Sequence, residues 1–189
     1  MNRSEARVRL PSLQQVEDER KELKRKRDRR VKLRSTIYVL IIVAAVAVIV
    51  ALLLISVLQV TGNSMEPTLM DGDIIVVAKT SNFTRGDISA FYFENKILLK
   101  RVIGLPGDYI EIDDDGTVSV NGEEIYEAYI SEKSLGHSDI KYPYKVPDEQ
   151  LFVLGDDRIS SIDSRSSLIG CIDKDQMVGR VIFKIGNVK

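Results

Sequence analysis

The sequence predicts a mainly β domain that follows a single membrane-spanning helix. Residues 36–58 contain no charged side chain and consist largely of isoleucine, valine, leucine and alanine. Beyond them, short apolar runs alternate with glycine, proline and aspartate turns, a pattern typical of strands. Basic residues crowd the segment before the apolar run. We therefore expect three parts: a basic tail at 1–35, a transmembrane helix at 36–58 and a folded domain at 59–189.

The apolar run is long enough to cross a lipid bilayer. As a helix, its 23 residues would extend about 34 Å at about 1.5 Å per residue, against about 30 Å for the hydrocarbon core of a bilayer. A cleavable secretory signal has a shorter apolar core of about 7–15 residues. This run is longer and follows 35 residues that are rich in charge. The sequence therefore predicts an uncleaved anchor, with the lipid bilayer as a partner.

The distribution of charge predicts the orientation of the anchor. Residues 1–35 carry 13 Lys or Arg against 6 Asp or Glu, whereas the rest of the chain carries 14 against 22. The positive-inside rule places the basic tail in the cytoplasm and the domain outside it. A basic segment can also bind nucleic acid. This one lacks interleaved aromatic residues and borders the span, so we expect attraction to anionic lipid and no nucleic-acid partner.

The residues after the anchor predict a β domain. Apolar runs rich in Val, Ile, Tyr and Phe predict strands at 74–78, 88–93, 97–103, 117–120, 150–154 and 176–185. Asn121-Gly122 follows one of these runs and predicts a tight hairpin turn. The acidic run at 113–116 lacks the loop spacing of a calcium-binding hand, and we interpret it as a turn. We expect no metal site.

The composition limits the catalytic chemistry that the domain can perform. The chain has one histidine, His137, between Gly136 and Ser138 in what we expect to be an exposed loop. A Ser-His-Asp triad needs a histidine base, and a histidine zinc site needs several. The single cysteine, Cys171, lies in an apolar stretch and is interpreted as a small buried hydrophobic residue. If the chain is a hydrolase, its base is therefore a carboxylate or a lysine.

One lysine and one serine stand out as candidates. Lys100 lies in an apolar run, and on a strand it would share a face with Leu98 and Val102. Burial would lower its pKa towards neutrality, because desolvation disfavours the charged amine. Ser64 is bracketed by turn residues that could present its hydroxyl. Each residue alone also has a simpler explanation, as a strand lysine with a packed stem or as a linker serine.

Three motifs in order favour the catalytic interpretation. Residues 62–69 read Gly-Asn-Ser-Met-Glu-Pro-Thr-Leu, residues 100–108 read Lys-Arg-Val-Ile-Gly-Leu-Pro-Gly-Asp, and residues 155–165 run from Gly-Asp-Asp-Arg to Ser-Ile-Asp-Ser-Arg. In sequence and spacing these motifs resemble the type I signal peptidases of bacteria. The resemblance covers the anchor and nearly all of residues 60–189. It implies a β fold like that of signal peptidases and repressor-type proteases.

The resemblance also implies an activity and a location. Such a protein would be a serine endopeptidase of the bacterial plasma membrane that cleaves signal peptides from secreted preproteins after small residues, without a cofactor. Ser64 would be the nucleophile, with its own backbone N–H in the oxyanion hole, and Lys100 would be the general base. Gly62 stands where some relatives carry a hydroxyl.

Further residues acquire supporting roles by the same resemblance. Ser161 would orient the lysine amine by a hydrogen bond, and Asp163 and Arg165 would form a supporting ion pair. Asp156 and Arg158 would belong to the same loop. A substrate pocket is implied at Met65 and Pro67.

Two other classes of protein remain open at this stage. A self-cleaving regulator of the phage-repressor type would share the dyad and a related fold, but such proteins are soluble. An anchored, non-catalytic chaperone or adhesion module would not need Ser64, Lys100 and Ser161 together. Residues 113–146 carry no motif that assigns them a role.

Overall fold

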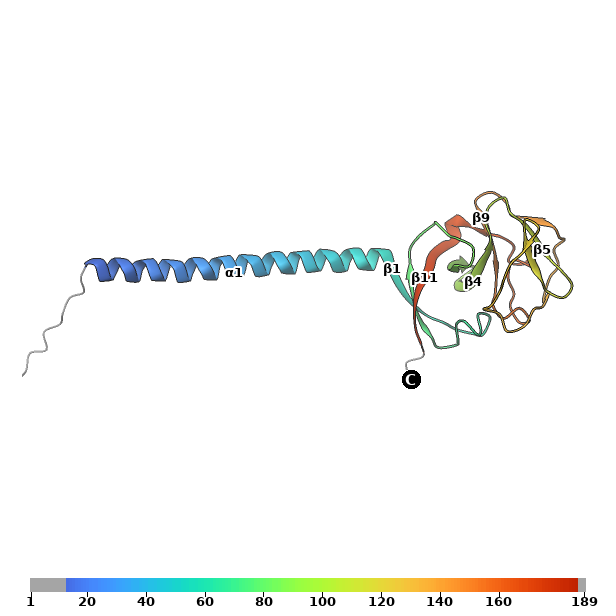
Figure 1. Ribbon diagram of the computed structural model, residues 1–189, viewed down its shortest axis with the longest axis horizontal. Coiled ribbons are helices and arrows are strands. Elements are labelled where there is room, and N and C mark those ends of the chain that lie inside the picture. Colours follow the sequence, from blue (N-terminus) through green and yellow to red (C-terminus); the bar gives the residue numbers. More distant parts are fainter. Residues whose placement is uncertain (1–12, 187–189) are drawn as a thin grey trace, which may run out of the picture. The chain divides into compact units, whose positions relative to one another are not determined.

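The computed structural model describes residues 13–186. The chain divides into two compact units, residues 1–51 and residues 52–189. Helix α1 (Leu13–Leu54) makes up the described part of the first unit and reaches the start of the second. Figure 1 shows it as one continuous helix, and the strands all follow it along the chain.

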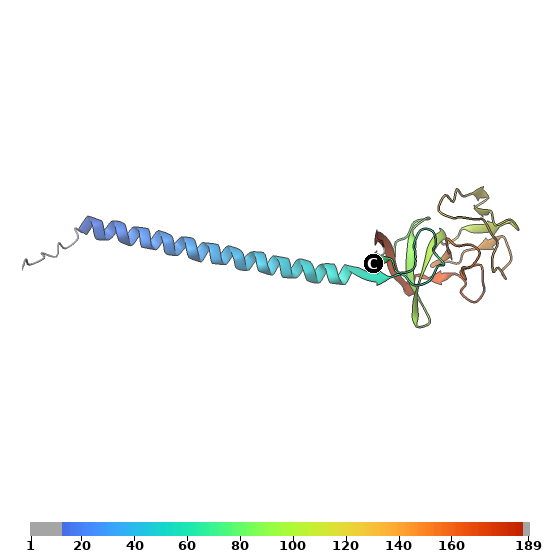
Figure 2. The same cartoon turned by 90° about the horizontal axis from the view of Figure 1, so that it is seen from below.

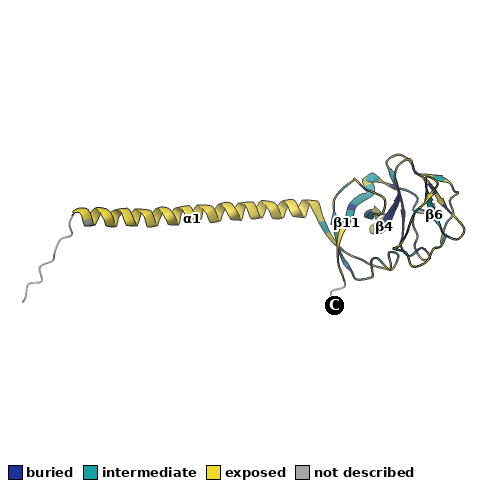
Figure 3. Ribbon diagram, in the orientation of Figure 1, coloured by how far each residue is buried: buried dark blue, intermediate teal, exposed yellow. Residues whose placement is uncertain are grey.

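Helix α1 is exposed along its described side chains, as Figure 3 shows. It includes much of the basic tail, whose glutamate, lysine and arginine residues favour helix. Within residues 13–186, one helix, between Val16 and Leu54, is long and apolar enough to cross a membrane by its length and composition. The prediction of a single apolar helix before a mainly β domain is confirmed.

The helix ends four residues before the predicted end at residue 58. Residues Ile55–Gln59 form strand β1 instead, paired antiparallel with β2 (Ile74–Ala78) from Ile55 opposite Ala78 to Gln59 opposite Ile74. The apolar composition suits either structure, and β-branched residues such as Ile55 and Val57 favour strand. The partner strand, which lies 15 or more residues further along the chain, decides between the two.

Two antiparallel sheets make up the folded domain, and Figures 1 and 2 show them from two sides. The seven-stranded sheet has the order β1-β2-β11-β3-β4-β9-β10. Its other members are β3 (Ile88–Phe93), β4 (Lys96–Gly104), β9 (Gln150–Leu154), β10 (Ile172–Asp173) and β11 (Met177–Ile185). The four-stranded sheet has the order β7-β6-β5-β8. It contains β5 (Tyr109–Ile112), β6 (Val118–Val120), β7 (Glu123–Glu124) and β8 (Tyr144–Lys145). A short 3₁₀ helix, Lys174–Gln176, precedes β11.

All six predicted strands are present, with ends within one residue of those expected. The predicted hairpin is also confirmed, because β6 and β7 pair across Asn121 and Gly122. Both turn residues have positive φ, 54° and 82°, as a type I′ turn requires. Strands β5, β7, β8 and β10 were not predicted separately. Three of these four have only two residues, too few for a periodic pattern.

The core consists of three apolar clusters, of which one supports the first motif. Met65 and Leu69 are 2% and 1% exposed and pack with Val60, Ile75 and Val77. The turn that contains Ser64 is therefore fixed to the large sheet by its neighbours in the sequence. The other two clusters lie around Phe91 and Phe152, within and between the sheets.

Strand β11 joins β2 to β3 and depends on a glycine to do so. The register against β3 shifts between Met177 and Gly179, and Gly179 has a φ of 155°. A Cβ atom there would clash with the backbone of Ala78 and Lys79. Only glycine fits this close approach of two backbones.

We predict that Gly179→Ala lowers the free energy of unfolding by about 1–3 kcal/mol, because the added methyl group forces β11 away from β2. The matched control is Gly186→Ala, since a Cβ at Gly186 has no neighbour within 4 Å. Thermal or denaturant unfolding of the detergent-solubilised protein measures both. Equal stability of the two variants would contradict this account of β11.

Candidate active site

Ser64 lies at the start of a turn, five residues after the end of β1. The turn is closed by hydrogen bonds from the N–H of Glu66 to the carbonyl of Asn63 (2.9 Å) and from the N–H of Leu69 to the carbonyl of Met65 (2.9 Å). Gly62, just before it, has a φ of 88°. Because Met65 and Leu69 are buried on the sheet, Ser64 is held half-buried at the surface of the domain.

Lys100 lies in the middle of β4 and is 3% exposed. Its backbone carbonyl accepts a hydrogen bond from the hydroxyl of Ser89 on β3, at 3.0 Å. Burial lowers the pKa of the amine from 10.5 to about 8, because the charged form loses its hydration. The negative charges of Asp163, Asp156 and Asp157 oppose this shift, and Arg165 adds to it. A substantial fraction of Lys100 is therefore neutral near pH 8.

The loop at residues 155–165 lies beside both candidates. The N–H of Asp157 donates to the carbonyl of Ser64 at 3.2 Å. Gly155 packs so closely against the Ser64 carbonyl and the Ser161 side chain that a Cβ would not fit between them. The carboxylates of this loop are also the charges that act on the Lys100 amine. The serine turn and the lysine strand thus share one loop as their neighbour.

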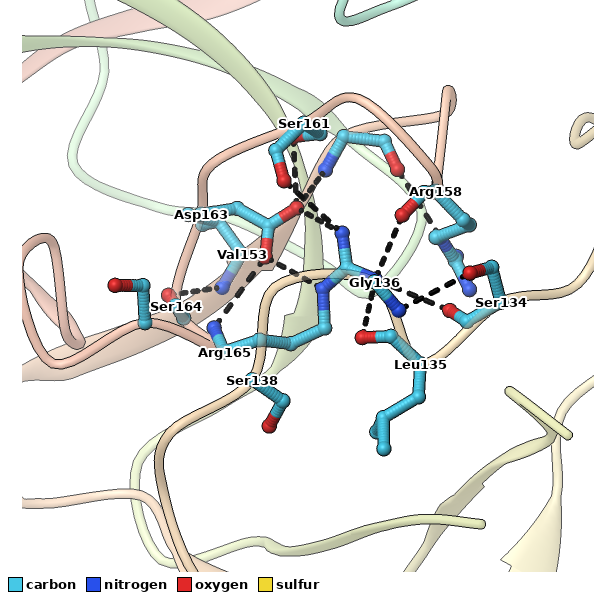
Figure 4. A network of polar contacts seen from close by, with 12 residues as sticks. Ser134, Leu135, Gly136, Ser138, Val153, Arg158, Ser161, Asp163, Ser164 and Arg165 are labelled. Atoms are coloured by element: carbon cyan, nitrogen blue, oxygen red, sulfur yellow. Dashed lines mark hydrogen bonds and ion pairs between the residues drawn. The ribbon is translucent and has the colours of Figure 1, made fainter. Parts of the chain in front are cut away.

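Asp163 and Arg165 form the ion pair that the sequence predicts, and both side chains are 0% exposed. The Arg165 guanidinium donates to the two carboxylate oxygens at 2.8 and 2.9 Å. Figure 4 shows this guanidinium at the centre of a network, with further bonds to the carbonyls of Ser134, Leu135 and Arg158. The loop is therefore tied to itself and to the segment around residue 135.

Ser161 makes a hydrogen bond within its own loop. Its hydroxyl donates to Oδ2 of Asp163 at 2.7 Å, and the contacts of residues 13–186 include no hydrogen bond from it to the Lys100 amine. Asp163 also accepts the Gly155 N–H at 2.9 Å. Ser161 is buried beside the loop backbone and close to Gly155.

Asp156 and Arg158 lie in the same loop but have different partners. Asp156 pairs with Arg101, at 2.8 and 2.5 Å, and its Oδ2 also accepts the hydroxyl of Thr68 at 2.5 Å. Arg158 pairs with Glu127, from the stretch that carries no motif. Arg101 directly follows Lys100, and Thr68 lies four residues after Ser64, so both could have been suspected. No motif in the sequence indicates a role for Glu127.

A groove of about 720 Å³ opens beside Ser64. It is lined by two segments of chain, from the end of β1 to the serine turn and the first half of β4: Leu58, Gln59, Val60, Thr61, Gly62, Ser64, Met65, Lys96, Ile97, Leu98 and Leu99. Of the two residues predicted for a substrate pocket, Met65 lines the groove. Pro67 is exposed and does not line it, because the turn carries it past the nucleophile. The pairing of β4 with β9 starts only at Arg101.

The two other reactive residues are poor candidates for catalysis. His137 is exposed, as the sequence predicts. Cys171 is half-buried and packs against the cluster around Phe152. Burial raises the pKa of its thiol to about 11, which leaves little thiolate at neutral pH.

Comparison with known proteins identifies the family. The model of the family "Signal peptidase, peptidase S26" matches residues 33–185. Signal peptidase I of Bacillus licheniformis is 42% identical over 137 residues, which cover 66% of this chain and 73% of that protein. Signal peptidase I T of Bacillus subtilis strain 168 is 41% identical over 138 residues, which cover 66% and 70%.

A third relative is similar over more of the chain. Signal peptidase I U of Bacillus subtilis strain 168 is 33% identical over 181 residues, which cover 87% of this chain and 94% of that protein. Among solved structures, a signal peptidase I from Enterococcus faecalis V583 matches with a TM-score of 0.44 and 30% identity, over 54% of this chain and 97% of that one.

The protein is a serine endopeptidase, since that is the activity of the family that its sequence matches along most of its length. The chain belongs to the signal peptidase I family, peptidase S26.

Proposed function

We propose that the protein is a membrane-anchored signal peptidase that cleaves preproteins with Ser64 as nucleophile and Lys100 as general base. The observation that carries this proposal is the burial of Lys100. A lysine residue that is 3% exposed, with a pKa lowered to about 8, can accept a proton near neutral pH, which an ordinary lysine cannot. One loop contacts both this strand, through Arg101 and Asp156, and the turn of Ser64.

The proposed reaction has two stages. Neutral Lys100 removes the proton from Ser64 Oγ, which attacks the scissile carbonyl to give a tetrahedral intermediate. The protonated amine then gives its proton to the leaving nitrogen, and the mature protein departs from the acyl-enzyme. Lys100, neutral again, activates a water molecule that hydrolyses the ester and restores Ser64. This scheme uses no metal or other cofactor.

The charge that develops on the carbonyl oxygen needs hydrogen-bond donors. The backbone N–H of Ser64 is our first candidate, because the turn that follows Ser64 is anchored by Met65 and Leu69. Gly62, with no side chain, contributes no hydroxyl. Asp163, Arg165 and Ser161 stabilise the loop from which the Asp157 N–H contacts Ser64, and we assign them a supporting role.

The groove beside Ser64 suits an extended peptide. The first half of β4 lines it and lies beyond the pairing with β9, so this part of the strand edge is open to a peptide that adds as a further strand. The side chains of Val60, Met65 and Leu98 make the groove partly apolar. The substrates that we propose are preproteins with small apolar residues before the cleavage site. This agrees with the signal peptides that the family name implies.

Helix α1 supplies the proposed anchor. Its uncharged part, residues 36–54, extends about 28 Å at about 1.5 Å per residue, close to the hydrocarbon thickness of about 30 Å. We propose that it spans the bacterial plasma membrane, with residues 1–35 in the cytoplasm and residues 59–189 outside. The excess of basic residues before the span supports this orientation.

The dyad is tested by Lys100→Arg. Arginine keeps the charge and much of the length, but its pKa above about 12 prevents it from acting as a base. We expect the initial rate of preprotein cleavage to fall about 10²–10⁴-fold, as far as in Lys100→Ala. The Ser64→Ala, Lys100→Arg double variant should be no slower than either single variant, because members of one catalytic unit are not additive.

The control for this experiment is Lys141→Arg, the same substitution at an exposed site. Circular dichroism of each variant checks that the β domain is folded. A folded Lys100→Arg protein with near-normal activity would refute Lys100 as the base, and a non-catalytic role for the dyad would have to be considered again.

The pH dependence of acylation offers a second test. Below pH 8 the Lys100 amine is protonated and cannot act as a base, and above pH 8 it is mostly neutral. We therefore expect the acylation rate to rise with pH, with a midpoint near the lowered pKa of about 8 rather than near 10.5. His137→Ala should leave the profile unchanged. A rise that disappears in His137→Ala would assign the base to the histidine.

The orientation in the membrane is tested with intact spheroplasts. We expect protease added from outside to degrade the β domain and to leave the basic tail, because the positive charge lies on the cytoplasmic side. Immunoblots with antibodies against each end of the chain report the two fragments. Protection of the β domain until the membrane is broken would exclude the proposed topology.

A further inference from the structure

We propose that Glu127 is a positioning residue of this peptidase, which acts through Arg158 and Tyr129 on the loop and strand that hold Ser64 and Lys100. The inference rests on the proposed function of these two residues. Glu127 belongs to residues 113–146, where the sequence carries no motif. It lies outside the three motifs, and it does not line the groove.

Glu127 forms a buried ion pair with Arg158. The two side chains are 2% and 1% exposed and lie 31 residues apart in the sequence. Arg158 donates from one terminal nitrogen to Oε2 at 2.9 Å and from the other to Oε1. Two parallel hydrogen bonds of this kind fix the direction as well as the position of a guanidinium.

Arg158 in turn holds the loop at two places. Its Nε donates to the carbonyl of Gly155 at 3.0 Å. Its own carbonyl accepts a hydrogen bond from Arg165 at 2.9 Å, which Figure 4 shows beside the bonds of Arg165 to Asp163. The side chain of Arg158 therefore sets the start of the loop, and its backbone meets the central ion pair.

The start of the loop is where displacement would matter most for catalysis. Gly155 packs against the carbonyl of Ser64 and against the side chain of Ser161, with no room for a Cβ. Its N–H donates to Asp163. A shift of Gly155 would therefore be transmitted directly to the nucleophile turn and to the charged groups around Lys100.

Tyr129 connects Glu127 to the lysine strand. Its hydroxyl donates to Oε1 of Glu127 at 2.7 Å, and its ring lies 3.9 Å from Cζ of Arg101, within the range of a cation–π contact. Burial and the neighbouring Glu127 raise the pKa of Tyr129, so the hydroxyl stays a donor. Arg101 adjoins Lys100 and pairs with Asp156. Glu127 is thus linked to both halves of the site.

The balance of buried charge predicts the effect of neutralising Glu127. Three buried carboxylates face three buried guanidinium groups in this part of the domain, in the pairs Glu127–Arg158, Asp156–Arg101 and Asp163–Arg165. Without the charge of Glu127, Arg158 would be left with no matched partner in a site away from water, which is unfavourable. It would move towards the remaining carboxylates and draw Gly155 with it.

The experiment measures kcat and KM for preprotein cleavage by the full-length, detergent-solubilised protein. The main variant is Glu127→Gln, which keeps the shape of the side chain and removes its charge. Glu124→Gln is the matched control, because Glu124 lies on β7 in the same stretch and its ion pair with Lys133 is exposed. Arg158→Gln and the Glu127→Gln, Arg158→Gln double variant complete a cycle.

We expect Glu127→Gln to lower kcat about 10–100-fold, since small misplacements of reacting groups have effects of up to about this size, and to change KM less than about twofold. The control should keep the activity of the unaltered protein. The double variant should be no slower than Arg158→Gln alone, because coupled residues are not additive. These three results together would support the proposal.

Other results would overturn it. A folded Glu127→Gln protein with unchanged kcat, a loss confined to KM, or a double variant whose loss is the product of the single losses would each exclude a role through Arg158. If Glu127→Gln does not fold, Tyr129→Phe decides, because it removes one hydrogen bond and keeps the ring. We expect kcat to fall severalfold in this variant, and an unchanged kcat would overturn the proposal.

The Glu127 experiment and the test of the Ser64–Lys100 dyad can fail independently of each other. If Lys100→Arg is inactive while Glu127→Gln is fully active, this inference fails and the dyad stands. If Lys100→Arg keeps its activity, the dyad itself is wrong, whatever the result at Glu127.

Discussion

The ion pair between Asp163 and Arg165 is the interaction on which the arrangement of the site depends. Both side chains are entirely buried, and removing one member of such a pair typically costs about 3–5 kcal/mol, because it leaves a buried charge unpaired. The pair also forms hydrogen bonds with surrounding backbone groups, including the N–H of Gly155 and the carbonyls of Ser134 and Leu135. A loop without regular secondary structure thereby acquires a defined shape.

Two opposing effects act on the pKa of Lys100 in the proposed mechanism. A lysine base must be desolvated to lose its proton, yet the same site contains several carboxylates that favour its charged form. Arg165, which pairs with Asp163, opposes the effect of these carboxylates by lowering the pKa of Lys100. Desolvation then remains the largest influence on its pKa. Desolvation and the charge of Arg165 thus keep the pKa of Lys100 low although acidic residues shape the loop.

The sequence predicted five of the seven strands of the large sheet, for reasons that are local. Strand 88–93 and the hairpin at Asn121-Gly122 follow from patterns within a few residues. Helix α1 ends early because pairing with β2 competes for residues 55–59, and no local pattern reports this. In the same way, no local pattern shows that the Ser161 hydroxyl donates to Asp163, since the partner of a hydroxyl depends on where the folded chain places it.

By itself, the sequence determined the family, the mainly β class, the single apolar helix, and the serine and lysine that are the candidates for catalysis. These properties depend on motifs and on composition, which are local features of the sequence. The Asp163–Arg165 pair was also expected from the motifs, but only the tertiary structure decided the partners of Asp156 and Arg158. Arg158 pairs with Glu127, 31 residues away in the sequence, rather than with its neighbour Asp156, because the partners of buried charges are selected by distance in space.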